Sequence, residues 1–106
     1  MIARMWHGVV AAEKAEGYSA YLSGFGVRDY EAIPGNRGVW VLRRAEGERV
    51  HFMLVSLWES LESIRKYAGP DAERAHYYEY DLECLIDPEP KAVHYEVLAT
   101  SGSLHR

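Results

Sequence analysis

The chain has 106 residues, of which 48% are hydrophobic, and a formal net charge of −4. This length supports one domain, and the hydrophobic fraction excludes a wholly disordered chain. The negative charge argues against nucleic-acid binding, because phosphate contacts require a concentrated basic face.

The first half of the chain alternates between strand and helix patterns. Residues 2–9 alternate as a strand, with His7 on the same face as Met5. From Ala11 the apolar spacing becomes helical, and clustered glycines predict that this helix frays before Asp29. The next segments are a turn, a strand and a hairpin turn at residues 34–36, 39–44 and 45–48.

The stretch from residue 50 to 68 changes from a strand pattern to a helix pattern. Residues 50–58 are apolar on both faces, which is typical of a central strand. Ser60 is a good helix N-cap, and Gly69-Pro70 ends the helix. Trp58 therefore stands at the junction, where we expect its ring to wall a cleft between sheet and helices.

The last third of the chain is more polar. Asp71 can cap a short helix that runs to about His76. Residues 77–90 are acidic and rich in tyrosine, and the prolines near their end predict an extended connection. Residues 93–98 alternate as a last strand.

The order strand, helix, strand, strand, helix, strand predicts an α+β, ferredoxin-like βαββαβ fold with both helices on one face of an antiparallel sheet. The domain spans residues 1–99, and residues 100–106 form a flexible tail. Residues 50–58 leave an apolar sheet face that so short a chain cannot cover. Two copies packed sheet to sheet would cover it, so we predict a homodimer.

The cysteine content and the apolar runs bound the location of the protein. Cys84 is the only cysteine, so no intrachain disulfide can form and a reducing compartment fits. The amino terminus lacks the pattern of a signal peptide, and no apolar run approaches the ~20 residues needed to span a bilayer. We expect a cytoplasmic protein with neither membrane nor nucleic acid as a partner.

Histidines and aromatic residues are the remaining candidates for chemistry, because the sequence has no phosphate loop, paired-cysteine zinc motif or nucleophile elbow. An isolated histidine is most often a partly buried residue with a hydrogen-bond partner. Tyrosines at helical spacing more often pack in a core with their hydroxyls at its rim, and a tryptophan packs there by default. The candidates are His7, His76, Trp58, Tyr18, Tyr21 and Tyr67.

Two segments, IPGNRGVWVLRR and LVSLWESLESIRKYA, resemble the antibiotic biosynthesis monooxygenase (ABM) family of dimeric α+β barrels. In that family a proline-glycine turn leads into the second strand, and a tryptophan-containing segment ends the third. The resemblance covers roughly residues 2–98. It implies a dimeric α+β barrel and a small aromatic ligand, but it names no single reaction, because the family holds different activities on one scaffold.

The resemblance suggests roles for particular residues. Cofactor-free members oxidise polycyclic phenols to quinones with O₂, and haem-degrading members use a strand asparagine, a helix tryptophan and an iron-binding histidine. These three positions fall on His7, Tyr67 and His76. We expect His7 or His76, both opening onto one cleft, to deprotonate a phenol without a cofactor or metal. Trp58, Tyr18, Tyr21 and Tyr67 would then bind the substrate.

Two alternatives stay open at this point. The first is a haem-binding or haem-degrading protein with His76 as the iron ligand. The second is a non-catalytic module on the same fold that binds a small ligand or a partner protein.

Overall fold

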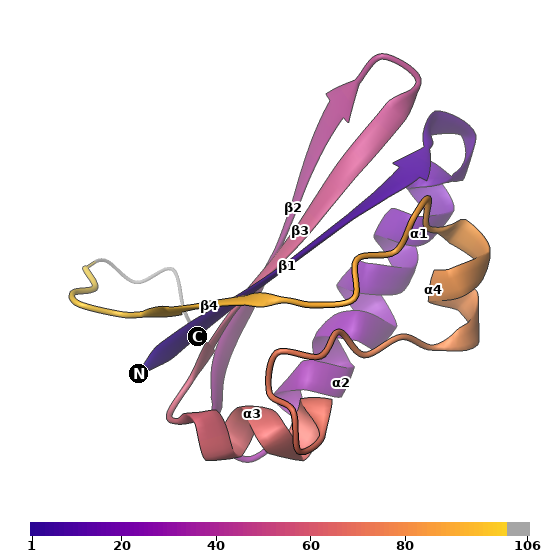
Figure 1. The fold of residues 1–106 in the computed structure, drawn as a ribbon. Coiled ribbons are helices and arrows are strands. Elements are labelled where there is room, and N and C mark those ends of the chain that lie inside the picture. The colour runs from indigo at the N-terminus through magenta and orange to yellow at the C-terminus, as the bar shows by residue number, and fades with distance from the viewer. Residues whose placement is uncertain (102–106) are drawn as a thin grey trace.

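The computed structural model describes residues 1–101. Four strands form one antiparallel sheet in the order β2-β3-β1-β4, and the helices cover one of its faces (Figure 1). This arrangement confirms the predicted ferredoxin-like α+β fold. The strands are β1 (Ile2–Ala11), β2 (Asn36–Glu46), β3 (Arg49–Trp58) and β4 (Val93–Glu96), and the helices are α1 (Ala15–Tyr21), α2 (Val27–Glu31), α3 (Leu61–Ala68) and α4 (Glu79–Cys84).

Strand pairing assigns each residue of the sheet to one of its two faces. Trp6 pairs with Leu54, and both are buried beneath the helices. His7 pairs with Met53 on the opposite face, which no helix covers. This open face is mostly apolar and includes Ala3, Met5, Trp40, Leu42, Met53, Val55, Leu57, Val93 and Tyr95.

Trp58 lies in the core. Its side chain is fully buried, its indole N–H donates to Ser56 Oγ at 2.8 Å, and the rings of Tyr30 and Tyr67 pack 6.0 and 6.4 Å away. A fully buried indole makes no wall of an open cleft, so the expected position of Trp58 at a cleft surface is wrong. Trp58 instead supports the tyrosines that stand between it and solvent.

The junction between β3 and α3 is built as the sequence predicts. The backbone N–H of Ser63 donates to Ser60 Oγ at 3.2 Å, and Gly69 ends the helix with φ of 95°. Gly35, at φ of 97°, lies so close to Ser63 that a side chain at position 35 would collide with it. The Gly35 carbonyl accepts from Glu59 N–H at 2.9 Å, which fixes the turn against the start of α3.

The first helical segment is longer than predicted. A 3₁₀ turn, η1 (Ala12–Lys14), leads into α1, and a π-helical turn, η2 (Leu22–Gly26), joins α1 to α2. The prediction that the helix frays before Asp29 is therefore wrong. The wider turn lets Val27 N–H bond to Leu22 O, so the glycine-rich stretch continues the helix instead of ending it.

The predicted helix from Asp71 to about His76 is absent, and a helix, α4, lies in the segment that was predicted to be extended. Asp71 initiates only a turn. The backbone next to it pairs with the chain before β4, through Ala75 N–H to Pro90 O at 2.9 Å and Ala92 N–H to Glu73 O at 2.8 Å. These long-range bonds use groups that a helix would need for its own ladder.

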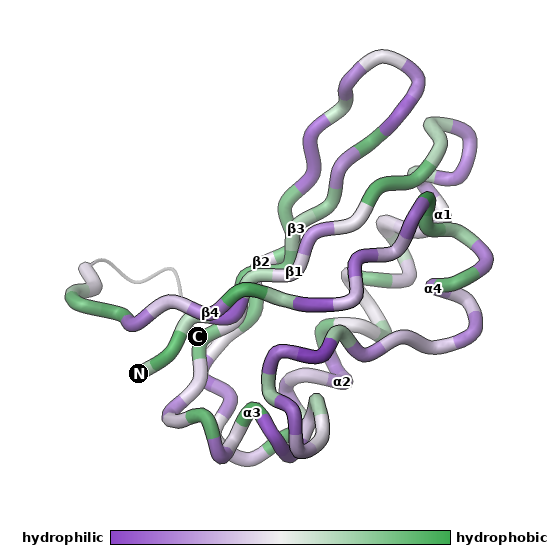
Figure 2. The backbone as a smooth tube through the Cα atoms, in the orientation of Figure 1, coloured by the Kyte–Doolittle hydropathy of each residue, from purple (hydrophilic) through white to green (hydrophobic). Residues whose placement is uncertain are grey.

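Two further features concern the ends and the surface. The tip of the β2–β3 hairpin is hydrophilic and exposed (Figure 2). Residues 102–106 of the predicted tail lie outside the described part of the chain. Within residues 1–101, no helix is long and apolar enough to cross a membrane.

We predict that Trp58→Ala destabilises the protein by about 3–5 kcal/mol, because it leaves a large cavity under Tyr30 and Tyr67. Urea unfolding followed by circular dichroism measures this change. Leu82→Ala, at an exposed position on α4, is the control and should change the free energy of unfolding by less than about 0.5 kcal/mol. Equal midpoints for the two variants would contradict the packing role of Trp58.

Candidate functional site

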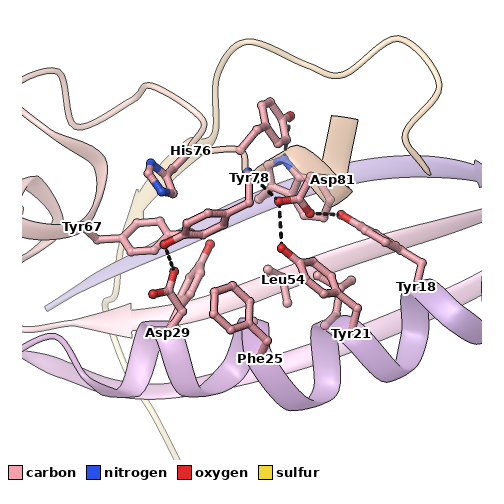
Figure 3. A pocket seen from close by; sticks show the side chains of 14 residues that line it. Tyr18, Tyr21, Phe25, Asp29, Leu54, Tyr67, His76, Tyr78 and Asp81 are labelled. Carbon is pink, nitrogen blue, oxygen red and sulfur yellow. Dashed lines mark hydrogen bonds between the residues drawn. The ribbon is translucent and has the colours of Figure 1, made fainter. Parts of the chain in front are cut away.

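The candidate site is a small pocket between the sheet, the first helical segment and the chain before α4 (Figure 3). It brings together four of the six residues predicted from the sequence: Tyr18, Tyr21, Tyr67 and His76. Its free volume is about 30 Å³, so the surrounding rings nearly close it. A ligand larger than a water molecule requires some of these rings to move outward.

A buried carboxylate forms one end of the pocket. Asp81 is 6% exposed and accepts hydrogen bonds from Tyr18 OH at 2.7 Å, Tyr21 OH at 3.3 Å and the backbone N–H of Tyr78 at 2.9 Å (Figure 3). The bond from Tyr78 caps the start of α4. The same side chain therefore holds α4 against α1 and faces the pocket.

The two tyrosines that donate to Asp81 remain protonated at neutral pH. Burial raises the pKa of Tyr18 far above its ordinary value, and the hydrogen bond to Asp81 raises it further. Burial also raises the pKa of Tyr21, with the nearby negative charge of Asp81 as the next cause. Both phenols therefore act as hydrogen-bond donors and cannot serve as bases.

His76 stands at the other end of the pocket (Figure 3). Edge-to-face contacts place its ring 5.2 Å from the ring of Tyr67 and 4.7 Å from that of Tyr78. Its side chain is exposed, and it forms no hydrogen bond with any residue in the described range. Its ring nitrogens are therefore available to a ligand.

Asp29 and Phe25 extend the pocket from below. Asp29 accepts a hydrogen bond from Tyr78 OH at 3.1 Å, and the Phe25 ring packs edge-to-face against Tyr78 at 5.1 Å. Phe25 and Tyr78 are 40% and 38% exposed, so they form the outer wall. The π-helical turn η2 places Phe25 at this position.

A buried arginine lies behind the pocket. The Arg4 guanidinium is 5.5 Å from the centre of the Tyr67 ring, and it donates to Tyr30 OH at 3.2 Å and to the carbonyl of Arg74 at 2.8 Å. Its Nε has no partner among residues 1–101. Burial raises the pKa of Tyr30 and Tyr67, and the positive charge of Arg4 opposes the rise in both.

The pocket floor includes Trp6, whose indole N–H donates to Tyr77 OH at 2.9 Å. Tyr77 OH in turn donates to the carbonyl of Glu89 at 2.6 Å. The Trp6 ring lies across Gly8, where a Cβ atom would collide with the indole and with Leu85. Only glycine therefore fits at position 8.

His7 does not line this pocket. It lies on the open face in a row of hydrogen bonds: its Nδ1 contacts Glu89 Oε2 at 2.7 Å, its Nε2 contacts His51 Nδ1 at 2.9 Å, and His51 Nε2 contacts Glu46 Oε1 at 2.7 Å. Both ring nitrogens of His7 are engaged. The expectation that His7 and His76 open onto one cleft is therefore wrong.

The row of side chains around His7 occupies every ring nitrogen of both histidines. Glu89 and Glu46 bind the two outer nitrogens, and the two inner nitrogens contact each other. Neither ring therefore offers a free nitrogen to a substrate.

Several site residues were not predicted from the sequence. The even-numbered face of β1, with Arg4 and Trp6, turned out to face the helices, and alternation alone does not say which face is covered. Asp81 could have been found as an acidic residue three positions after a helix N-cap, had the helix at α4 been recognised. The missed lining residues with polar or aromatic side chains are Trp6, Phe25, Asp29, Tyr30, Tyr77, Tyr78 and Asp81, and Arg4 lies behind them.

Comparisons with known proteins show the fold. The chain aligns with a protein of Nitrosomonas europaea described as an antibiotic biosynthesis monooxygenase, with TM-score 0.69 and 17% identity over 93% of this chain and 100% of that one. It aligns with the haem-degrader MhuD of Mycobacterium tuberculosis, solved with two haems in its active site, with TM-score 0.65 and 21% identity over 96% and 100%. A Bacillus cereus protein described as an antibiotic biosynthesis monooxygenase gives TM-score 0.66 and 16% identity over 97% and 96%. No family model and no curated protein matches the sequence.

We predict that stability falls as pH rises above about 10, since the unfolded tyrosines lose their protons there while Tyr18 and Tyr21, with raised pKa values, keep theirs. Tyr18→Phe removes one such group and should lose less stability than wild type between about pH 9 and 11. Urea unfolding of wild type and Tyr18→Phe at both pH values measures how much stability each protein loses. Lysines contribute equally to the loss in the two proteins. Equal losses would contradict the buried, protonated state of Tyr18.

Proposed function

We propose that this protein is a cofactor-free, monooxygenase-like enzyme that oxidises a small aromatic or phenolic substrate in the pocket at His76. The observation that carries the proposal is a histidine with unengaged ring nitrogens at one end of an aromatic pocket. Sharing the fold of structures described as antibiotic biosynthesis monooxygenases also supports it. A shared fold does not identify a reaction, so the proposal rests on the residues of the pocket.

In the proposed reaction, His76 takes the proton of an acidic phenol or anthrone. The resulting carbanion-like ring is electron-rich and reacts with O₂ without a further reductant. For an anthrone, one oxygen atom replaces the two hydrogens of the methylene carbon as a carbonyl, and the other leaves as water. The substrate supplies all four electrons, so the balance needs only O₂.

The remaining predicted site residues have supporting parts in this proposal. The Tyr67 ring packs against His76 and would orient the substrate ring beside it. Tyr18 and Tyr21 act through Asp81, which they hold at the far end of the pocket. Trp58 supports Tyr67 from the core and touches no ligand.

Haem is the second candidate, because His76 lies in the pocket and MhuD shares the fold. The pocket residues do not fit a porphyrin. Asp29 and Asp81 line the pocket, and no lysine or arginine in the described range does, so the two carboxylates of a haem would meet like charges.

We further propose that the protein is a homodimer that packs its open sheet faces together. This face holds exposed apolar side chains, including Leu42, Val93 and Tyr95, which are 49%, 53% and 56% exposed. A groove of about 810 Å³ opens over its β2 and β3 strands, beside Trp40, Leu42, Val55 and Leu57. Dimer interfaces of this kind bury on the order of 2,000 Å² or more, which a whole sheet face can supply.

Replacing His76 tests the reaction. We predict that His76→Ala lowers the rate of O₂ uptake with a hydroxyanthrone by ~10²–10⁴-fold, because it removes the general base. An oxygen electrode measures the rate. His7→Gln, on the other face of the sheet, is the matched control and should keep most of the activity. No uptake by wild type over a broad panel of phenols would leave the non-catalytic binding module as the better description.

Replacing one apolar residue on the open face tests the dimer. We predict that wild type sediments at twice the monomer mass and that Leu42→Glu sediments as a monomer, because a buried unpaired carboxylate is costly. Leu82→Glu, at a similarly exposed leucine on α4, should stay dimeric. Sedimentation equilibrium at low micromolar concentration distinguishes these outcomes, and a monomeric wild type contradicts the proposal.

A further inference from the structure

The pocket at His76 carries negative charge without a counter-ion. Asp81 is 6% exposed, and Asp29 is half-buried. Neither carboxylate forms an ion pair with any residue of the described chain. The nearest buried cation, Arg4, lies behind the Tyr67 ring and directs its donors to Tyr30 OH and a backbone carbonyl.

Hydrogen bonds offset only part of the cost of this charge. Asp81 accepts three bonds from neutral donors, and Asp29 accepts one from Tyr78. Neutral donors share the charge but do not cancel it, and a buried charge without an opposite charge is costly. A positively charged ligand beside these carboxylates would remove the imbalance, whereas an anionic ligand would increase it.

The aromatic rings around the pocket also favour a cation. Tyr21, Phe25 and Tyr78 line the pocket beside the two carboxylates, and Tyr78 spans from Asp81 to Asp29 (Figure 3). The faces of aromatic rings attract cations, and cages of such rings recognise organic ammonium groups. High pKa values keep the phenol of Tyr21 uncharged at neutral pH, and burial likewise raises the pKa of Tyr78. The rings and the carboxylates therefore both favour a positively charged ligand.

We propose that the ligand of this pocket is a phenolic molecule that carries a protonated amine. His76 and Asp81 stand at opposite ends of the pocket, and Asp29 lies below Tyr67 (Figure 3). The phenol would lie at His76, and the ammonium group would face the side of the pocket that carries the two carboxylates. Entry requires outward rotation of Phe25 and Tyr78, the exposed rings of the outer wall. The inference deepens the proposed function, since it names the substrate class for the same site.

Three phenols of similar size and different charge test the proposal: 3-(2-aminoethyl)phenol, 3-(2-hydroxyethyl)phenol and 3-hydroxyphenylacetate. Binding is measured by titration calorimetry and by quenching of tryptophan fluorescence, to which Trp6 in the pocket floor contributes. We expect the amine to bind about 10-fold more tightly than the alcohol, in line with one cation held by rings and carboxylates. The carboxylate should bind most weakly.

A charge-neutral replacement connects the selectivity to the pocket. Asp29→Asn keeps the size of the side chain and an acceptor for Tyr78 OH, and it should reduce the preference for the amine over the alcohol at least ~3-fold. Asp71→Asn, on an exposed turn, is the matched control and should retain the full preference. Phe25→Leu, which removes an exposed ring of the outer wall, serves as a second pocket variant if Asp29→Asn fails to fold, and it should also reduce the preference for the amine.

The outcomes separate this inference from the proposed reaction. Equal binding of the three phenols, or no binding of the amine up to about 10 mM, overturns the cationic ligand class, and turnover of uncharged anthrones could still occur. Selective binding of the amine that depends on Asp29 supports the ligand class even where no O₂ is consumed. Tighter binding of the carboxylate overturns it outright.

Discussion

The buried carboxylate of Asp81 is the interaction on which the helical side of this protein depends. It receives two phenol hydroxyls from α1 and one backbone N–H at the start of α4. Losing it would leave the buried Tyr18 hydroxyl, the partly buried Tyr21 hydroxyl and a helix N-terminus without this acceptor, and an unmet buried donor costs about 1–3 kcal/mol. The same carboxylate forms one end of the pocket. One side chain therefore joins α1 to the start of α4 and also lines the pocket.

The fold was predictable because its largest signals are local. Residues 50–58 read as a central strand and Ser60 as a helix cap, and both predictions are confirmed. The helix at α4 was missed because the competing signal is not local. Pairing of residues 73–75 with residues 90–92 removes the predicted helix at residue 71, and the cap at Asp81 creates another eight residues later. Neither bond can be inferred from spacing along the chain.

The candidate site was predicted only in part, because the sequence does not show which face of β1 the helices cover. The two faces of β1 are similarly apolar in sequence, with Met5 and Val9 on one and Trp6 and Val10 on the other. The helices cover the face that contains Arg4, a residue that composition alone assigns to the surface. Arg4 is tolerated there because Tyr30 OH and a backbone carbonyl accept two of its hydrogen bonds and the Tyr67 ring lies beside its guanidinium. His7 was expected in the cleft because the face of β1 that contains Met5 and His7 was expected to lie under the helices.

The two faces of the sheet are physically connected through Glu89. Its carboxylate binds His7 on the open face, and its carbonyl accepts from Tyr77, which holds Trp6 in the pocket floor. The backbone of Glu89 thus supplies the acceptor for Tyr77, and Tyr77 in turn accepts from the indole of the pocket floor. Trp6 has little freedom to move, because its ring already fills the space above Gly8. Glu89 therefore joins the histidines of the open face to the floor of the pocket through two hydrogen bonds of its own.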